Sequence, residues 1–253
     1  AGGEAALAAH VNAAVAQMNV AMQRSAVPGQ IRLAGLVMTN TAEVGGDLDI
    51  DLTRLRAPND GFFDEAQPAR EATHADFVSL WVGGPVTTSC GLGYLAKRES
   101  SAYHALFAKS CATANMTFAH ESGHNFQLEH DANASESPTG QSIPHARGYS
   151  YVNPTATAGW YTIMAYPTAC LAAVASRNCR KIQNYSNPNI LEDAVPTGTA
   201  AANNALALSQ TFASVANYRQ ERITGPAPVI TGRPLVGTAL GVTTGSWLPS
   251  ETT

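Results

Sequence analysis

The sequence predicts a layered domain of the α+β or α/β class. Helical and strand-like patterns alternate over the first half of the chain, and a long stretch rich in Ser, Pro, Asn and Gly, residues 131–167, follows and reads as irregular. The 253 residues suffice for one large domain, or for one domain with part of another. A hydrophobic content of 45% excludes a chain that is disordered throughout.

The amino-terminal part predicts one helix and one strand. Leu7, Val11, Val15, Met18 and Met22 recur at helical spacing, so we expect an amphipathic helix over 7–22 that ends before Pro28-Gly29. A strand is expected over 31–39. Acidic and apolar residues then alternate from Asp47 to Asp51, which predicts a solvated acidic face, with a calcium site as the alternative.

The later elements follow from apolar runs bounded by turn residues. We expect a helix over 64–72, a buried strand over 76–82, short strands over 91–96 and 102–108, a helix over 115–127 and a last helix over 203–219.

The composition changes near residue 222, which divides the chain into a domain over 1–222, a linker over 223–228 and a tail over 229–253. The tail resembles the opening of a bacterial immunoglobulin-like repeat, and an unstructured extension is the alternative. The residues that carry this resemblance are Gly232, Pro234, Val236, Gly237, Gly245, Trp247 and Pro249.

Charge and cysteine content restrict the partners and the compartment. A net charge of −4 lacks the basic surface that nucleic acid requires, and no apolar run is long enough to span a membrane. We expect a soluble, monomeric, exported protein whose secretory signal has been removed or lies outside this sequence, since the chain begins at Ala1 without a leader.

The four cysteines predict two disulfides, because none shows the CxxC spacing of a thiolate metal site. Three pairings are open, and Cys90–Cys111 with Cys170–Cys179 is favoured because sequence-near pairs close short loops.

The segment 117–131 carries the chemistry. His120 and His124 are four residues apart, which on a helix places both imidazoles on one face, and His130 follows six residues later. Three neutral imidazoles leave zinc one open position for water, and Glu121 is placed to take a proton from that zinc-bound water as it attacks a peptide carbonyl. The spacing therefore predicts metal-assisted hydrolysis of peptides or proteins.

The segment FAHESGHNFQLEHD, together with Thr162-Ile-Met-Ala-Tyr166, resembles the metzincin zinc endopeptidases, and most closely their reprolysin (adamalysin) branch. CGLGYL, TIMAYP and NYSNPNI are similar to segments of secreted bacterial members, and the resemblance spans about residues 5–221. It implies an α+β fold: a twisted, mostly parallel sheet with an antiparallel edge strand, a zinc-binding helix and an irregular C-terminal subdomain.

The resemblance also implies residue roles. His120, His124 and His130 would ligate zinc, Glu121 would be the general base, and Met164 would lie in a tight turn beneath the metal. Asp131 would fix local structure by hydrogen bonding. The strand that would pair with an extended substrate comprises Gly91, Leu92, Gly93 and Tyr94.

Gln127 and Tyr166 depart from the pattern of the family. Gln127 replaces the glycine that the family uses to end the helix in a left-handed turn, so we expect a strained Gln127, with a longer helix as the alternative. Tyr166 could touch zinc or the oxyanion, line the substrate pocket or pack in the core.

A different class of function remains open: a non-catalytic binding or adhesion module on a protease-like scaffold. The presence of Glu121 and all three histidines favours the enzyme.

Overall fold

The computed structural model describes residues 3–44, 46–84, 86, 89–108, 111–134, 143–219, 229–231 and 241–243. The chain divides into two units, Ala1–Arg219 and Gln220–Thr253. In the second, β9 (Val229–Thr231) and β10 (Gly241–Thr243) pair antiparallel. The linker expected over 223–228 and the residues that carry the immunoglobulin-like resemblance lie outside the described residues, so the domain bounds stay predictions.

The first unit contains a three-stranded sheet in the order β1 (Val78–Val82), β3 (Tyr103–Phe107), β2 (Gly91–Gly93). β1 and β3 run parallel, and β2 pairs antiparallel with β3. The sheet therefore has the expected antiparallel edge strand, β2.

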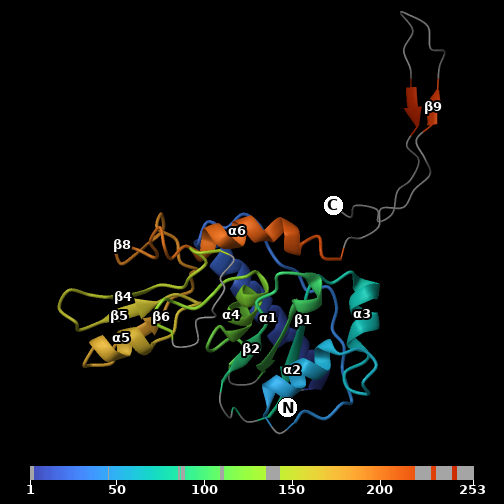
Figure 1. Cartoon of the computed structure of the whole chain (residues 1–253), viewed down its shortest axis with the longest axis horizontal. Helices are drawn as coiled ribbons and strands as arrows, with labels where there is room; N and C mark the ends of the chain where they lie inside the picture. Colours follow the sequence, from blue (N-terminus) through green and yellow to red (C-terminus); the bar gives the residue numbers. More distant parts are fainter. Residues whose placement is uncertain are drawn as a thin grey trace, which may run out of the picture. The chain divides into compact units, whose positions relative to one another are not determined.

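Helices cover both faces of this sheet (Figure 1). α2 (Leu48–Arg56) contacts β3 on one face, and α4 (Thr117–Asn125) contacts β2 and β3 and lies against α1 (Gly3–Arg24). Successive β3 side chains alternate accordingly: Ala105 and Phe107 join the core beneath α2, while Leu106 joins the core of α1 and α4. The result is an α/β/α arrangement with α4 in the interior.

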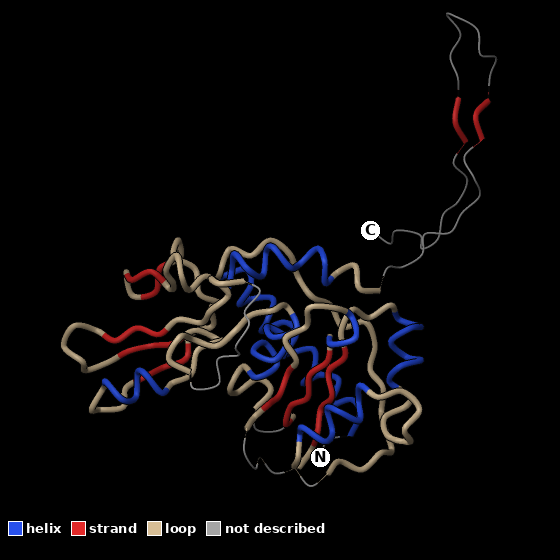
Figure 2. Tube along the Cα trace, in the orientation of Figure 1, coloured by secondary structure: helices blue, strands red, loops and turns tan. Residues whose placement is uncertain are grey.

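A second, small sheet was not predicted: two of its strands lie within the stretch 131–167 that was expected to be irregular, and the third follows it (Figure 2). β4 (Ser150–Val152), β5 (Gly159–Tyr161) and β6 (Cys179–Lys181) form it, with β5 central. Its strands have only three residues each, and the central strand β5 also depends on β6, which lies outside that stretch, so local pattern did not show them.

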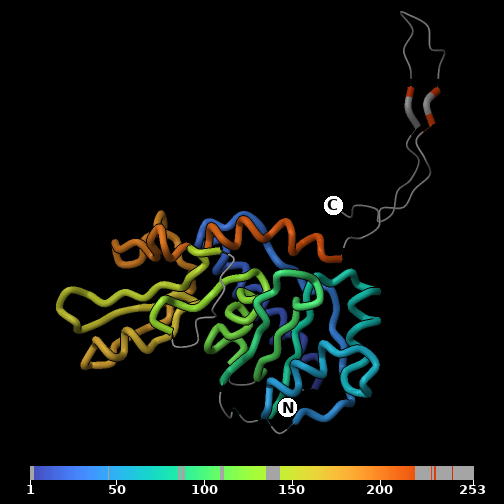
Figure 3. The backbone as a smooth tube through the Cα atoms, in the orientation of Figure 1, coloured from blue at the N-terminus to red at the C-terminus, as the bar shows by residue number. Residues whose placement is uncertain are grey.

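The remaining elements of the first unit are short or peripheral. They are α3 (Ala66–Thr73), the 3₁₀ turn η1 (Glu99–Ser101), α5 (Thr168–Ala173), β7 (Leu191–Glu192), β8 (Val195–Pro196) and α6 (Asn204–Val215). α6 ends before the predicted residue 219. Its residues share a core with those of α1, and the two helices run near one another in Figure 3.

The strand expected over 31–39 is absent: the described segment 27–44 has no regular secondary structure. The Asn19 side chain accepts from the Ile31 N–H and donates to the Ile31 carbonyl, both at 2.8 Å, which uses main-chain groups that a strand would need. Residues 30–39 and β1 also line a common cavity of about 1040 Å³, so the segment stands away from the free edge of the sheet.

The acidic segment 47–51 begins a helix, in which Asp47 and Asp49 are exposed, as a solvated face predicts, whereas Asp51 is buried. Asp47 caps α2 by accepting from the main-chain N–H groups of Asp49 and Ile50. Asp51 is fully buried and accepts from the Val44 N–H, while burial raises the pKa of its carboxyl. Among the described residues, the only cluster able to hold a metal lies elsewhere, so nothing supports calcium here.

Both favoured disulfides are present. Cys90 pairs with Cys111, and Cys170 pairs with Cys179. The first connects the start of β2 to the loop before α4, and the second connects α5 to β6. In the described part of the chain, no helix has the length and apolar character needed to cross a membrane.

Candidate metal centre

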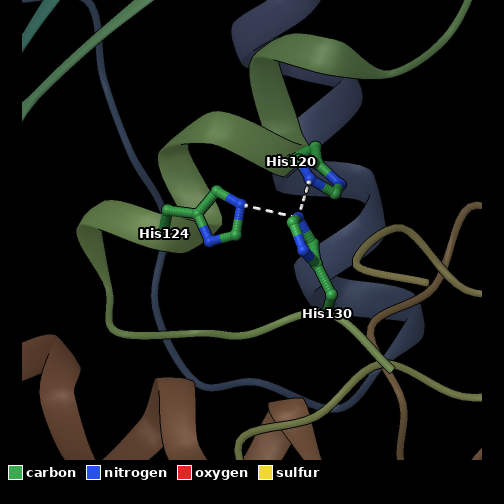
Figure 4. Close-up of side chains that lie close together, drawn as sticks. All are labelled: His120, His124 and His130. Atoms are coloured by element: carbon green, nitrogen blue, oxygen red, sulfur yellow. Dashed lines mark hydrogen bonds between the residues drawn. The ribbon is translucent and has the colours of Figure 1, made fainter. Parts of the chain in front are cut away.

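Helix α4 presents two of the three predicted ligands. His120 and His124 are one turn apart, and their rings project to the same side of the helix (Figure 4). Every residue of α4 is buried, with His120 and His124 each 8% exposed. The two imidazoles are therefore held by packing on all sides.

The third ligand reaches the same point because the chain reverses directly after the helix. Gln127 has φ +66°, and the N–H groups of Gln127 and Leu128 donate to the carbonyls of His124 and Gly123, each at 2.9 Å. This is a Schellman motif, normally completed by glycine. The expectation that Gln127 takes the left-handed conformation is confirmed, and the turn carries His130 back toward α4.

The three Nε2 atoms converge. Those of His120 and His124 both lie 3.1 Å from that of His130, and the possible ligand atoms of the trio lie within 4.8 Å of one another (Figure 4). The Nδ1 atoms of His120 and His124 donate to the main-chain carbonyls of Ile163 and Leu128, each at 2.8 Å. These bonds fix the tautomer that leaves Nε2 as a lone-pair donor.

Electrostatics keep the trio neutral. Burial, helped by neighbouring positive charge, lowers the pKa of His124 to about 3, that of His130 to about 4 and that of His120 well below its ordinary value. Three neutral imidazole nitrogens aimed at one point form the donor set that zinc takes in catalytic sites, where further positions stay open. The residues present therefore fit a zinc ion.

Glu121 lies between α4 and the edge strand β2. It is 5% exposed, and burial raises the pKa of its carboxyl to about 8 while the charge of Lys181 acts in the opposite direction. A Cβ added at Gly91 would come within 2.6 Å of Glu121 Cγ and Oε1, and one added at Gly93 within 3.0 Å of Oε2. The two glycines thus let β2 approach the carboxylate. Leu92 lies between them in β2, and Tyr94 follows the strand, donating its N–H to the Tyr103 carbonyl.

Met164 lies in a tight turn against α4. The Ala165 N–H donates to the Thr162 carbonyl across this turn, and Met164 is fully buried. A Cβ at Gly123 would come within 2.6 Å of the Met164 sulfur, so Gly123 is the contact point between turn and helix. The same turn supplies the Ile163 carbonyl that orients His120.

Tyr166 lies beside the histidines. Its ring centroid is 4.3 Å from that of His130 and 6.2 Å from that of His120. Asp131 accepts from the Tyr166 N–H at 2.8 Å and from the Asn133 N–H at 3.0 Å, which confirms its expected role in local structure. The tyrosine is partly exposed.

Sequence reasoning missed three contributors to this site. The carbonyls of Ile163 and Leu128 are main-chain groups, which no residue pattern reports. Lys181 comes from β6, and its charge acts on Glu121, His120 and His130. An isolated lysine more than fifty residues from the ligands gives no spacing signal.

The fold and the convergent histidines define a metallopeptidase-type centre. Residues 1–183 match a reprolysin-type family model described as metallo-peptidase family M12. The chain belongs to this family, and its three-histidine site is of the kind that binds zinc there.

Relatives and a solved structure agree. A peptidyl-Asp metalloendopeptidase of Stenotrophomonas maltophilia (strain K279a) is 35% identical over 212 residues, covering 83% of this chain and 47% of that protein. One from Xanthomonas campestris pv. campestris is 33% identical, covering 83% and 46%. The chain thus spans about half the length of these curated relatives. A chain from a solved structure described as "Structure of a chaperone-substrate complex" has a TM-score of 0.62 at 18% identity, covers 87% of this chain and 32% of its own, and supports the fold.

Proposed function

We propose that this chain carries the catalytic part of an exported zinc endopeptidase that acts on peptides containing aspartate at the cleaved bond. The observation that carries the proposal is the convergence of the three Nε2 atoms beside the carboxylate of Glu121. The names of the relatives support the aspartate, and the two disulfides support export. The monomeric state stays a prediction.

In this proposal His120, His124 and His130 hold zinc. Bound zinc supplies Lewis acidity, which polarises a peptide carbonyl and makes water a better nucleophile. Glu121 accepts the proton of the attacking water at its carboxylate and passes it to the departing amine. The Met164 side chain packs against helix α4 at Gly123. These side chains are nearly fully buried, which limits access of bulk water to the proton transfer.

The substrate is proposed to lie along β2. This strand is at the edge of its sheet, so an extended peptide can pair with Gly91, Leu92 and Gly93 through main-chain hydrogen bonds. Tyr94 borders the end of this strand. Tyr166, next to His130, is proposed to donate its hydroxyl to the developing oxyanion.

The test separates metal binding from proton transfer. Glu121→Gln keeps the size of the side chain but removes the base, so we expect hydrolysis of casein to fall about 10²- to 10⁴-fold while zinc content by atomic absorption stays at that of the parent protein. Glu65→Gln, an exposed glutamate distant in sequence from the trio, is the matched control and should leave both unchanged. Full activity in Glu121→Gln would contradict the mechanism, and a parent protein without chelator-sensitive hydrolysis would favour the binding-module function.

A further inference from the structure

Among the described residues, Lys181 is a cation near the metal centre that has no carboxylate partner. Lys181 is partly buried, and its Nζ donates to the Asn115 main-chain carbonyl at 3.1 Å. Within the residues that the structure describes, no acidic side chain lies at ion-pair distance from it. Its ammonium group also lies 5.7 Å from the centroid of the Tyr161 ring, so both of these partners are neutral, and a partly buried charge without a counter-ion is costly unless one arrives.

Arg180, the neighbouring cation in the sequence, differs from Lys181 because it forms ion pairs. Arg180, one residue earlier in β6, pairs with Glu192 at 2.6 Å and with Asp193 at 2.7 Å. Adjacent side chains on a strand point to opposite faces. Arg180 therefore faces the acidic β7–β8 turn, whereas Lys181 faces Asn115 and the beginning of α4.

That direction leads to the reacting groups. Asn115 precedes α4 by two residues, and Thr117 and Glu121 lie one turn apart on its face toward β2, since a Cβ at Gly91 would touch both side chains. Lys181 is also linked, through strand pairing, to the turn that contains Met164. It is the register partner of Tyr161, two residues before the carbonyl that orients His120.

The charge of Lys181 acts on the pKa values of Glu121, His120 and His130. It opposes the effect of burial on the Glu121 carboxyl and lowers the pKa values of His120 and His130. Burial lowers the pKa of Lys181 itself to about 8, and Glu121 acts in the opposite direction, so the amine is mainly protonated at neutral pH. Arg147 also lies near the trio, where it donates to the His130 carbonyl.

We propose that Lys181 is the specificity-determining residue that receives the aspartate carboxylate of a peptide bound along β2. The proposal rests on the proposed endopeptidase function and deepens it. A peptide on β2 passes Glu121 and the first turn of α4, and its side chain beside the cleaved bond can reach the ammonium group there. In a chain with net charge −4, a local cation is also what offsets repulsion of an acidic substrate.

The experiment uses the full chain and two peptides that differ only in Asp or Asn beside the cleaved bond, with products mapped by mass spectrometry. The parent protein should prefer the Asp peptide. Lys181→Gln should lower the Asp-to-Asn ratio of kcat/KM about 10- to 100-fold, because the lost charge on Glu121 and the histidines affects both peptides alike, whereas the lost contact with the carboxylate affects only the Asp peptide. Lys181→Arg should retain the preference.

Arg180→Gln is the matched control, because it removes an equal charge one position away on the opposite face, and its ratio should equal that of the parent. An equal loss with both peptides in Lys181→Gln, or an unchanged ratio, would overturn the assignment. Failure of the endopeptidase function itself looks different: the parent protein would then cleave neither peptide in a chelator-sensitive way. Zinc content and melting temperature, measured for each variant, separate loss of specificity from loss of folding.

Discussion

Gly91 lies so close to helix α4 that the absence of a side chain is a structural requirement. An added Cβ would come within 2.6 Å of Glu121 Cγ, Glu121 Oε1 and Thr117 Cγ2. The helix is buried on all sides and cannot retreat, so β2 or the Glu121 carboxylate would have to move. β2, the strand expected to pair with substrate, therefore also sets the position of the carboxylate through its glycines.

We therefore expect Gly91→Ala to reduce kcat/KM about tenfold or more, because a displacement of about 1 Å at a reacting group is already costly. Gly83→Ala is the matched control: a Cβ there meets no atom within 4 Å. Peptide hydrolysis by both variants, with zinc content measured in parallel, checks this. Equal activity of the two variants would show that β2 does not constrain Glu121.

At the scale of elements, the second sheet determines where the turn behind the metal and Lys181 lie. β5 leads into the turn at Met164, and β6 pairs with β5 in parallel and carries Lys181. The Ile163 N–H donates to the Asn184 carbonyl just beyond β6, which continues the pairing to the turn. Because each strand has only three residues, the pairing provides few hydrogen bonds. A covalent cross-link is therefore expected to contribute to the stability of this sheet.

The Cys170–Cys179 disulfide provides that cross-link. It joins residues separated by 9 positions, and removing a cross-link over a loop of this size costs about 2–3 kcal/mol of unfolding free energy in the chain-entropy description. We expect Cys170→Ala/Cys179→Ala to lose about this much in urea unfolding. Reduction of the double variant should then affect only the Cys90–Cys111 bridge, and a double variant as stable as the parent would mean that the sheet needs no covalent support.

At the scale of the whole chain, the metal centre is built entirely within Ala1–Arg219. The last residue of this unit is anchored, because the Arg219 guanidinium pairs with Glu71 and Glu99 and its N–H donates to Asp76. Every described contact of the trio, Glu121 and Lys181 comes from this unit.

A chain ending at Arg219 should therefore bind zinc, melt at the temperature of the full chain and cleave peptides at the same rate. Calorimetry, zinc analysis and peptide hydrolysis on the two lengths check this. A shortened chain that unfolds or loses zinc would show that residues 220–253 contribute to the catalytic unit, against the domain division predicted from sequence.

The sequence alone determined the ligand trio and the general-base candidate, and it favoured the disulfide pairing that the structure has. His120, Glu121 and His124 occur at helical spacing, and such local periodicity directly reports which side chains share a face. Gln127 was also foreseen as left-handed, because His130 can return to α4 only through a reversal at that point.

The tertiary structure alone decided what depends on partners distant in the chain. Residues 31–39 read as a strand but found no neighbouring strand, since Asn19 takes their first main-chain groups. Asp51 looked solvated but is buried and accepts from the Val44 N–H, and β4 and β5 formed where the composition indicated irregular structure. Lys181 reached the metal centre only through the register of β6 on β5. A local pattern records which face a side chain takes on its own element, but long-range pairing chooses which elements that face will meet.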